Sequence, residues 1–76
     1  MGKSPMKLNI SNQISSLRAE NKVTQEELAQ AIEVTRATIG SIEKGKYNPS
    51  LELAFRISLF FKKNINEVFN IEGNHE

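Results

Sequence analysis

Cysteine is absent from this 76-residue sequence, which excludes a disulfide framework and a zinc site built on thiolates. Histidine occurs once, as His75 next to the C-terminus, and no glycine-rich phosphate loop, nucleophile–base pair or metal-ligand spacing is present. Aspartate is absent as well, and the nine glutamates are typical of solvated helix surfaces. These absences argue against an enzyme and predict no cofactor and no metal.

A long hydrophobic run is also missing. No apolar stretch approaches the roughly 20 residues of a membrane-spanning helix, and no secretion signal is visible. We therefore expect a cytoplasmic protein with no membrane partner. The length fits one domain, and we expect an N-terminal extension over 1–9 that could include an expression tag, a domain over 10–72 and a loose tail over 73–76.

The stretch TQEELAQAIEVTRATIGSIEK predicts two short helices joined by a tight corner. Thr24 is a favourable N-cap, and Glu27 three residues later completes a capping box. Thr35 is a second N-cap, placed after a corner at Glu33. Apolar residues recur at helical spacing on one side of each helix, at Leu28, Ala29 and Ile32 and then at Ile39 and Ile42. This pattern indicates a helix-turn-helix.

The second helix of the pair, over 36–44, leaves one face free for a partner. Only two apolar residues anchor it, and its other face carries small, polar or basic side chains. A face with Arg, Ser and Lys but no carboxylate suits a polyanion. The net charge of +1 does not itself indicate a nucleic-acid partner, whereas the clustering of Arg36, Lys44 and Lys46 at this helix does.

A wider pattern surrounds these helices. Gln25 opens the pair, Ala29 is the small residue where the two helices cross, and GKYNPSLELA leads into the next helix. In these features the chain resembles the phage-repressor/Cro family, also called the xenobiotic-response-element family of bacterial regulators, over roughly 10–69. Short repressors of the cytolysin-regulator type are the most similar. Glu33 departs from the family, which often has Gly at this corner, and a left-handed residue other than Gly costs on the order of 1 kcal/mol. The core positions that carry the resemblance are Leu28, Ile32, Val34, Ile39 and Ile42.

The resemblance implies an all-α, five-helix, lambda-repressor-like DNA-binding domain. It also implies a sequence-specific transcriptional regulator, a homodimeric repressor that binds an inverted-repeat operator in double-stranded DNA through its recognition helix, 36–44. Two alternatives remain open. One is an antitoxin that neutralises a toxin or another protein partner and represses its own operon, and the other is a structural partner domain that has lost DNA binding.

The resemblance further implies which residues contact DNA. Gln25 matches a phosphate-contacting Gln of the family, although a surface helix former would look the same. Arg36 and Ala37 occupy base-reading positions: Arg36 either pairs with guanine or grips a phosphate, and Ala37 either touches a thymine methyl or permits close approach. Gly40 either permits close approach of the backbone to DNA or is simply tolerated. The loop over 46–48 offers phosphate donors. The full expected set is Gln25, Thr35, Arg36, Ala37, Thr38, Ser41, Lys44, Lys46, Tyr47 and Asn48.

An ion pair is implied as well. Arg18 lies where the family has an Arg that pairs with a Glu at the end of the recognition helix, which here is Glu43. Such a pair would hold the recognition helix against the first helix. The alternative is two solvated surface charges, and a surface pair contributes only about 0–1 kcal/mol.

A fourth helix is predicted from Leu51 to Phe61, capped by Ser50 and apolar almost all round. A helix that is apolar on every side is normally buried on every side, and so short a chain cannot surround it. We therefore expect a second copy of the chain to cover part of it; the alternative is a few exposed apolar residues of the ordinary kind. The expected dimer interface is Leu53, Leu59, Phe60, Phe69 and Ile71.

The remaining helices are shorter. A first helix is expected from Ser11 or Asn12 to Glu20, with Asn21 as a left-handed stop. The family resemblance implies a short fifth helix over 65–69, with Asn66 as its cap. Weak alternation over 7–10 and 69–72 predicts two short strands that either pair beside the helices or remain coil.

Overall fold

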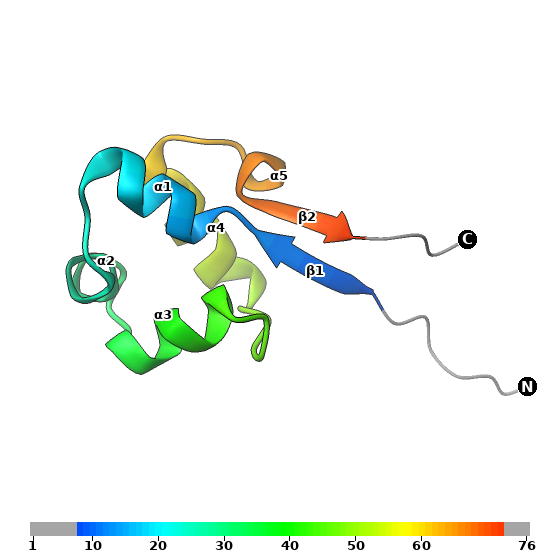
Figure 1. The fold of residues 1–76 in the computed structure, drawn as a ribbon, viewed down its shortest axis with the longest axis horizontal. Coiled ribbons are helices and arrows are strands. Elements are labelled where there is room, and N and C mark those ends of the chain that lie inside the picture. The colour runs from blue at the N-terminus through cyan, green and yellow to red at the C-terminus, as the bar shows by residue number, and fades with distance from the viewer. Residues whose placement is uncertain (1–7, 73–76) are drawn as a thin grey trace, which may run out of the picture.

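The computed structural model describes residues 8–72, which contain five helices and a ribbon of two short strands (Figure 1). The expected all-α, five-helix class with a small two-stranded element is therefore confirmed. Residues 1–7 and 73–76 lie outside the described range, so the expected tag, the start of the first strand at Lys7, the loose tail and His75 are not described. In order, the elements are β1 (Asn9–Asn12), α1 (Ile14–Asn21), α2 (Gln25–Ile32), α3 (Arg36–Glu43), α4 (Leu51–Phe61), α5 (Ile65–Val68) and β2 (Phe69–Glu72).

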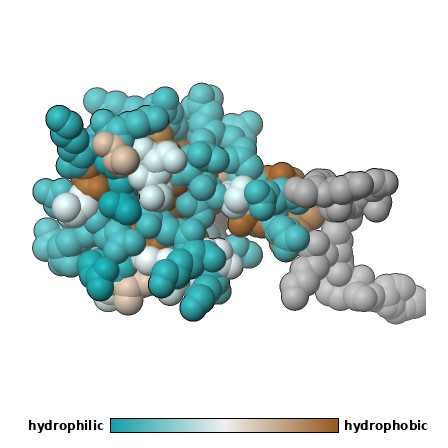
Figure 2. Space-filling model, viewed as in Figure 1, coloured by the Kyte–Doolittle hydropathy of each residue, from teal (hydrophilic) through white to brown (hydrophobic). Residues whose placement is uncertain are grey.

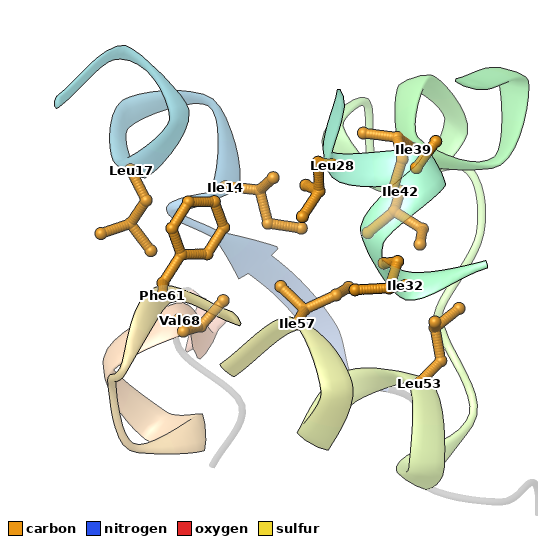
Figure 3. Packing of buried hydrophobic residues seen from close by; sticks show 11 residues of the cluster. Ile14, Leu17, Leu28, Ile32, Ile39, Ile42, Leu53, Ile57, Phe61 and Val68 are labelled. Carbon is orange, nitrogen blue, oxygen red and sulfur yellow. The ribbon is translucent and has the colours of Figure 1, made fainter. Parts of the chain in front are cut away.

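One hydrophobic core joins all five helices (Figure 3). Each helix contributes at least one side chain that is fully buried, and α3 contributes two. Because each helix buries an apolar stripe against the others, the core fixes the helices relative to one another. The largest fully buried side chains are Ile14, Leu28, Ile39, Ile42, Ile57 and Val68.

The helix starts follow the capping residues in the sequence. Glu27 N donates to Thr24 Oγ1 at 3.0 Å and Thr24 N donates to Glu27 Oε1 at 2.9 Å, which confirms the capping box of α2. Thr35 Oγ1 accepts from Thr38 N at the start of α3, and Ser50 Oγ accepts from Leu53 N at the start of α4. The bounds of α4 agree with the prediction at both ends.

Two expectations about helix ends are tested by left-handed residues. Glu33 ends α2 with φ 65°, so the corner does hold a left-handed residue other than glycine. The stop of α1, however, is Lys22 with φ 57°, and the expected stop at Asn21 was wrong. Asn21 stays in the helix because its Nδ2 donates to Leu17 O at 2.8 Å, one turn earlier.

The start of α1 differs from the prediction as well. Ser11 and Asn12 belong to β1, which pairs antiparallel with β2, with Asn12 opposite Phe69. Asn12 then ends the strand, because its Oδ1 accepts from Ile14 N at 3.1 Å and its Nδ2 donates to Ile42 O at 2.9 Å. These two bonds place the first helical residue at Ile14 and tie the ribbon to the end of α3.

The fifth helix is one turn long, and its cap lies two residues earlier than expected. Its N-cap is Asn64, not Asn66, and Asn64 N donates to Glu67 Oε1 at 2.8 Å. The chain becomes extended at Phe69, which is the first residue of β2 rather than the last of the helix. β1 and β2 therefore run side by side and project from the helical part of the molecule (Figure 1).

Candidate nucleic-acid interface

Helix α3 presents one face to the core and the other to solvent. Ile39 and Ile42 are buried and point into the cluster shared with α2 (Figure 3). On the opposite side Arg36, Ala37 and Lys44, which directly follows the helix, are exposed. The outward face thus carries small side chains and cationic ones, as the sequence predicted.

The only carboxylate of α3, that of Glu43, is bound in an ion pair with Arg18. Arg18 Nε and Nη2 donate to the two oxygens of Glu43, at 2.7 and 3.3 Å, and the side chains are 18% and 11% exposed. The predicted pair is confirmed, and the alternative of two solvated charges was wrong. Arg18 Nη1 also donates to Val23 O at 3.1 Å, so one guanidinium joins α1, the turn after it and α3. Neutralising Glu43 leaves the outer side of α3 attractive to an anion.

Gln25, at the start of α2, joins this ion pair to Arg36. Its Nε2 donates to Glu43 Oε1 at 3.0 Å, and its Oε1 accepts from Arg36 Nη1 at 2.8 Å. A carboxylate only accepts and a guanidinium only donates, so the two neighbours fix the orientation of the amide between them. The guanidinium of Arg36 is therefore held at the N-terminal end of α3, with its other nitrogens available to a ligand.

The fold does not require glycine at position 40. A Cβ built on Gly40 would lie 3.9 Å from Gln25 Nε2, which is an ordinary van der Waals distance. The two alternatives for this residue, close approach to DNA and simple tolerance, both remain.

The loop after α3 turns back beside the helix. Gly45 has φ 76°, a conformation suited to glycine, and Lys46 N donates to Ser41 O at 2.9 Å. Lys46, Tyr47 and Asn48 are exposed. Tyr47 reaches back toward α3, where it lines an open hollow together with Ala37, Thr38 and Ser41.

The structure brings most of the expected DNA contacts to one surface, but four of them already have partners within the chain: Gln25 and Arg36, as described above, and Thr35 and Thr38. The Oγ1 atoms of Thr35 and Thr38 lie 3.0 Å apart and share a hydrogen bond, and Thr35 Oγ1 also caps the helix. No pattern in the sequence predicted the roles of Asn12, which binds the last turn of α3, and of Arg56, which donates to Ile32 O at the end of α2. Only tertiary geometry reveals these two residues as supports of the helix pair.

The expected dimer residues do not all lie on the surface. Leu53 is buried in the core, so this expected interface residue is not available to a partner, and Phe69 is half-buried against the same core. Leu59 is 74% exposed and Ile71 is 55% exposed. Phe60 packs edge-on against the core residue Phe61, with 4.9 Å between the centroids of the two rings. Exposed apolar residues outside the expected set are Ile10, Leu51 and Phe55.

These exposed apolar residues come from α4 and from the two-stranded ribbon. The view in Figure 2 is largely hydrophilic over the helices, with hydrophobic residues gathered where the ribbon leaves them. Within residues 8–72 no helix is long and apolar enough to cross a membrane. In the same range no three His, Cys, Asp or Glu side chains are grouped so that they could hold a metal ion.

A capped helix pair with a cationic outer face, held on a five-helix core, defines a helix-turn-helix DNA-binding domain of the Cro/repressor class. Residues 14–68 match the helix-turn-helix family model HTH_3. The chain therefore belongs to the Cro/C1-type helix-turn-helix family, whose members are DNA-binding transcriptional regulators and not enzymes.

Named relatives and solved structures agree with this family. An HTH-type transcriptional regulator from Methanocaldococcus jannaschii is 49% identical over 61 residues, which are 80% of this chain and 92% of that protein. The immunity repressor protein of Bacillus phage phi105 is 36% identical over 44 residues, or 58% of this chain and 31% of the repressor. The restriction-modification controller protein C.AhdI from Aeromonas hydrophila has a TM-score of 0.68 and 25% identity, covering 72% of this chain and 83% of the controller.

Proposed function

We propose that this protein is a homodimeric transcriptional repressor that binds an inverted-repeat operator and acts in the cytoplasm. The observation that carries the proposal is the state of α3: its one carboxylate is bound by Arg18, and Arg36 is held outward by Gln25. An exposed helix with an anchored guanidinium at its N-terminal end suits the major groove, which is read by the N-terminal residues of a recognition helix.

The side chains on this surface divide into two roles. Arg36 reads a base, since a guanidinium with free nitrogens can bind guanine O6 and N7 together. Lys44, Lys46 and Asn48 are exposed around the end of α3 and bind phosphates, which position the protein without reading sequence. Gln25 keeps one N–H beyond its bond to Glu43 and can donate it to a phosphate at the N-terminus of α2.

The dimer follows from the apolar surface of α4. Leu59 and Phe60 border an open hollow with Ala31, Ile32 and Glu33 on α2 and at its end. Contact between two copies at this place removes apolar area from water. A two-fold axis there presents two α3 helices to DNA, and such a pair reads an inverted repeat.

Repression is the simplest regulatory outcome, because a dimer bound across a promoter blocks access of the polymerase. The phage immunity repressor among the relatives supports repression as the regulatory effect. The relatives described above are regulators of transcription, and they favour a transcriptional regulator over the antitoxin alternative.

Selection of bound genomic fragments with the purified protein tests the proposal. We expect fragments that share an inverted repeat with half-site centres about 10–10.5 base pairs apart, or a multiple of that spacing. Recovery of fragments with no shared sequence would contradict specific binding, and a single asymmetric half-site would contradict the dimer. Transcription from a promoter that carries the selected site should fall when the protein is added.

A further inference from the structure

The hollow beside the recognition helix has no role in the contacts assigned above. It has a volume of about 300 Å³, opens to solvent, and is lined by Ala37, Thr38 and Ser41 of α3 and by Tyr47 of the following loop. Tyr47 is 45% exposed. Because three of its lining residues belong to α3, the hollow lies on the face that the proposed function places against DNA.

The lining is mostly apolar on an otherwise polar face. Ala37 offers only a methyl group. Thr38 has its hydroxyl engaged with Thr35 Oγ1 at 3.0 Å, which leaves its methyl group as the part without a partner. Tyr47 adds the side of an aromatic ring, and Ser41 adds one hydroxyl at the edge. Binding an apolar group against such a lining is favourable because it removes apolar surface from water, whereas binding a phosphate there gains little.

The charges around the hollow identify the kind of molecule that fills it. Arg36, Lys44 and Lys46 are exposed next to its lining residues, and Glu43 is bound by Arg18. A cationic border with an apolar centre matches a base edge framed by two phosphate backbones. In the major groove the only apolar group on a base edge is a methyl group at C5 of a pyrimidine.

Resting on the proposed function, we infer that this hollow receives the C5 methyl group of a pyrimidine, and that Tyr47 is a specificity-determining residue rather than a phosphate contact. Thymine supplies this group in ordinary DNA, and 5-methylcytosine supplies the same group in methylated DNA. Tyr47 is the lining residue that comes from the loop rather than from α3, and in this assignment its ring, and not its hydroxyl, carries the recognition.

The experiment removes or adds only the methyl group. Starting from the selected operator, each thymine is replaced in turn by deoxyuridine, and each cytosine by 5-methylcytosine, and the dissociation constant is measured. We expect one position in each half-site where loss of a thymine methyl weakens binding about fourfold, or where methylation of cytosine strengthens it about fourfold. The two arms distinguish thymine from methylated cytosine as the source.

Two variants then assign the effect to Tyr47. Tyr47→Ala should reduce the ratio between methylated and unmethylated duplex to about one, while Tyr47→Phe should keep it. Thermal unfolding of both variants checks that the exposed substitution leaves the fold intact. The reverse pattern, in which Tyr47→Phe weakens binding to cognate and random DNA alike with an unchanged methyl ratio, would identify a phosphate contact and overturn the inference.

The outcomes separate the inference from the function beneath it. If the selection yields no shared sequence, the proposed function fails before the methyl groups are tested. If it yields an operator to which the protein binds with the same affinity whether or not each C5 methyl group is present, the regulator stands and the methyl-binding hollow is wrong.

Discussion

Arg36 Nη1 donates a hydrogen bond of 2.8 Å to Gln25 Oε1, and this bond crosses from the start of α3 to the start of α2. Gln25 is itself held by Glu43, and Glu43 by Arg18. The guanidinium at the tip of the recognition helix is therefore supported by three side chains from three helices. Pre-organisation of this kind lowers the entropy that a long side chain loses when it binds a base.

Because Gln25 positions Arg36, the two should be coupled in DNA binding. We predict that Arg36→Ala costs less affinity in a protein that already has Gln25→Ala, with a coupling energy of about 0.5–3 kcal/mol in a double-mutant cycle on the cognate duplex. Additive losses would instead show that Gln25 acts alone, for example through a phosphate.

Arg36 and Lys46 should differ in what they recognise. We predict that Arg36→Ala costs about 1–3 kcal/mol on the cognate site and relaxes preference at one base pair in each half-site. Lys46→Ala should weaken cognate and scrambled DNA alike and lower the slope of log affinity against log salt by about one. A salt titration of both variants on both duplexes measures this. Equal losses on the two duplexes for Arg36→Ala would reassign Arg36 to a phosphate.

The pair of Arg18 and Glu43 should matter for stability, since both side chains are largely buried. Arg18→Ala leaves the Glu43 carboxylate with fewer donors, and we predict a loss of about 1–3 kcal/mol in the free energy of unfolding by denaturant. Glu52→Ala is the control, because Glu52 is 76% exposed and bonds Arg56 at 2.8 Å on the surface; that loss should be below about 1 kcal/mol. Equal losses of unfolding free energy in the two variants would show that burial does not strengthen the pair of Arg18 and Glu43.

The left-handed corner offers a stabilising substitution. Glu33 has φ 65° and an 81% exposed side chain, whose nearest cationic atom, Arg56 Nη1, is 3.9 Å away. We predict that Glu33→Gly raises the free energy of unfolding by up to about 1 kcal/mol, because glycine adopts this conformation without strain. Gln30→Gly is the control inside α2 and should lower it by about 1 kcal/mol. A melting temperature that falls for Glu33→Gly would show that the corner carries no strain.

The sequence predicted well wherever one local motif decides the structure. The capping box at Thr24 and the cap at Ser50 placed the starts of α2 and α4 correctly, since each depends on residues within one turn. Arg18 and Glu43 are 25 residues apart in the chain, so no local motif could predict that they pair. That prediction came from the family resemblance.

The errors occurred where several residues compete for the same role. Asn12, Asn21, Asn64 and Asn66 are all plausible ends of helices, and the bonds that choose among them are both local and distant. Asn12, for instance, is placed by Ile42 O, which is 30 residues away. Likewise the all-round apolar pattern of α4 cannot say which side is buried, so Leu53 was assigned to a dimer although it lies in the core.

The exposed half of α4 supplies the last prediction. Leu59 is 74% exposed, so Leu59→Glu should change the stability of a single chain by no more than about 0.5 kcal/mol. In a dimer the same change places two carboxylates, one from each chain, in an apolar contact and should shift the protein from twice the chain mass to the chain mass in sedimentation at micromolar concentration. Affinity for the inverted repeat should fall with it, because each half-site is then bound separately. Ser15→Glu introduces the same charge at an exposed position of α1 and should leave the mass unchanged. A wild-type protein that sediments as a single chain at high concentration would contradict the interface on α4.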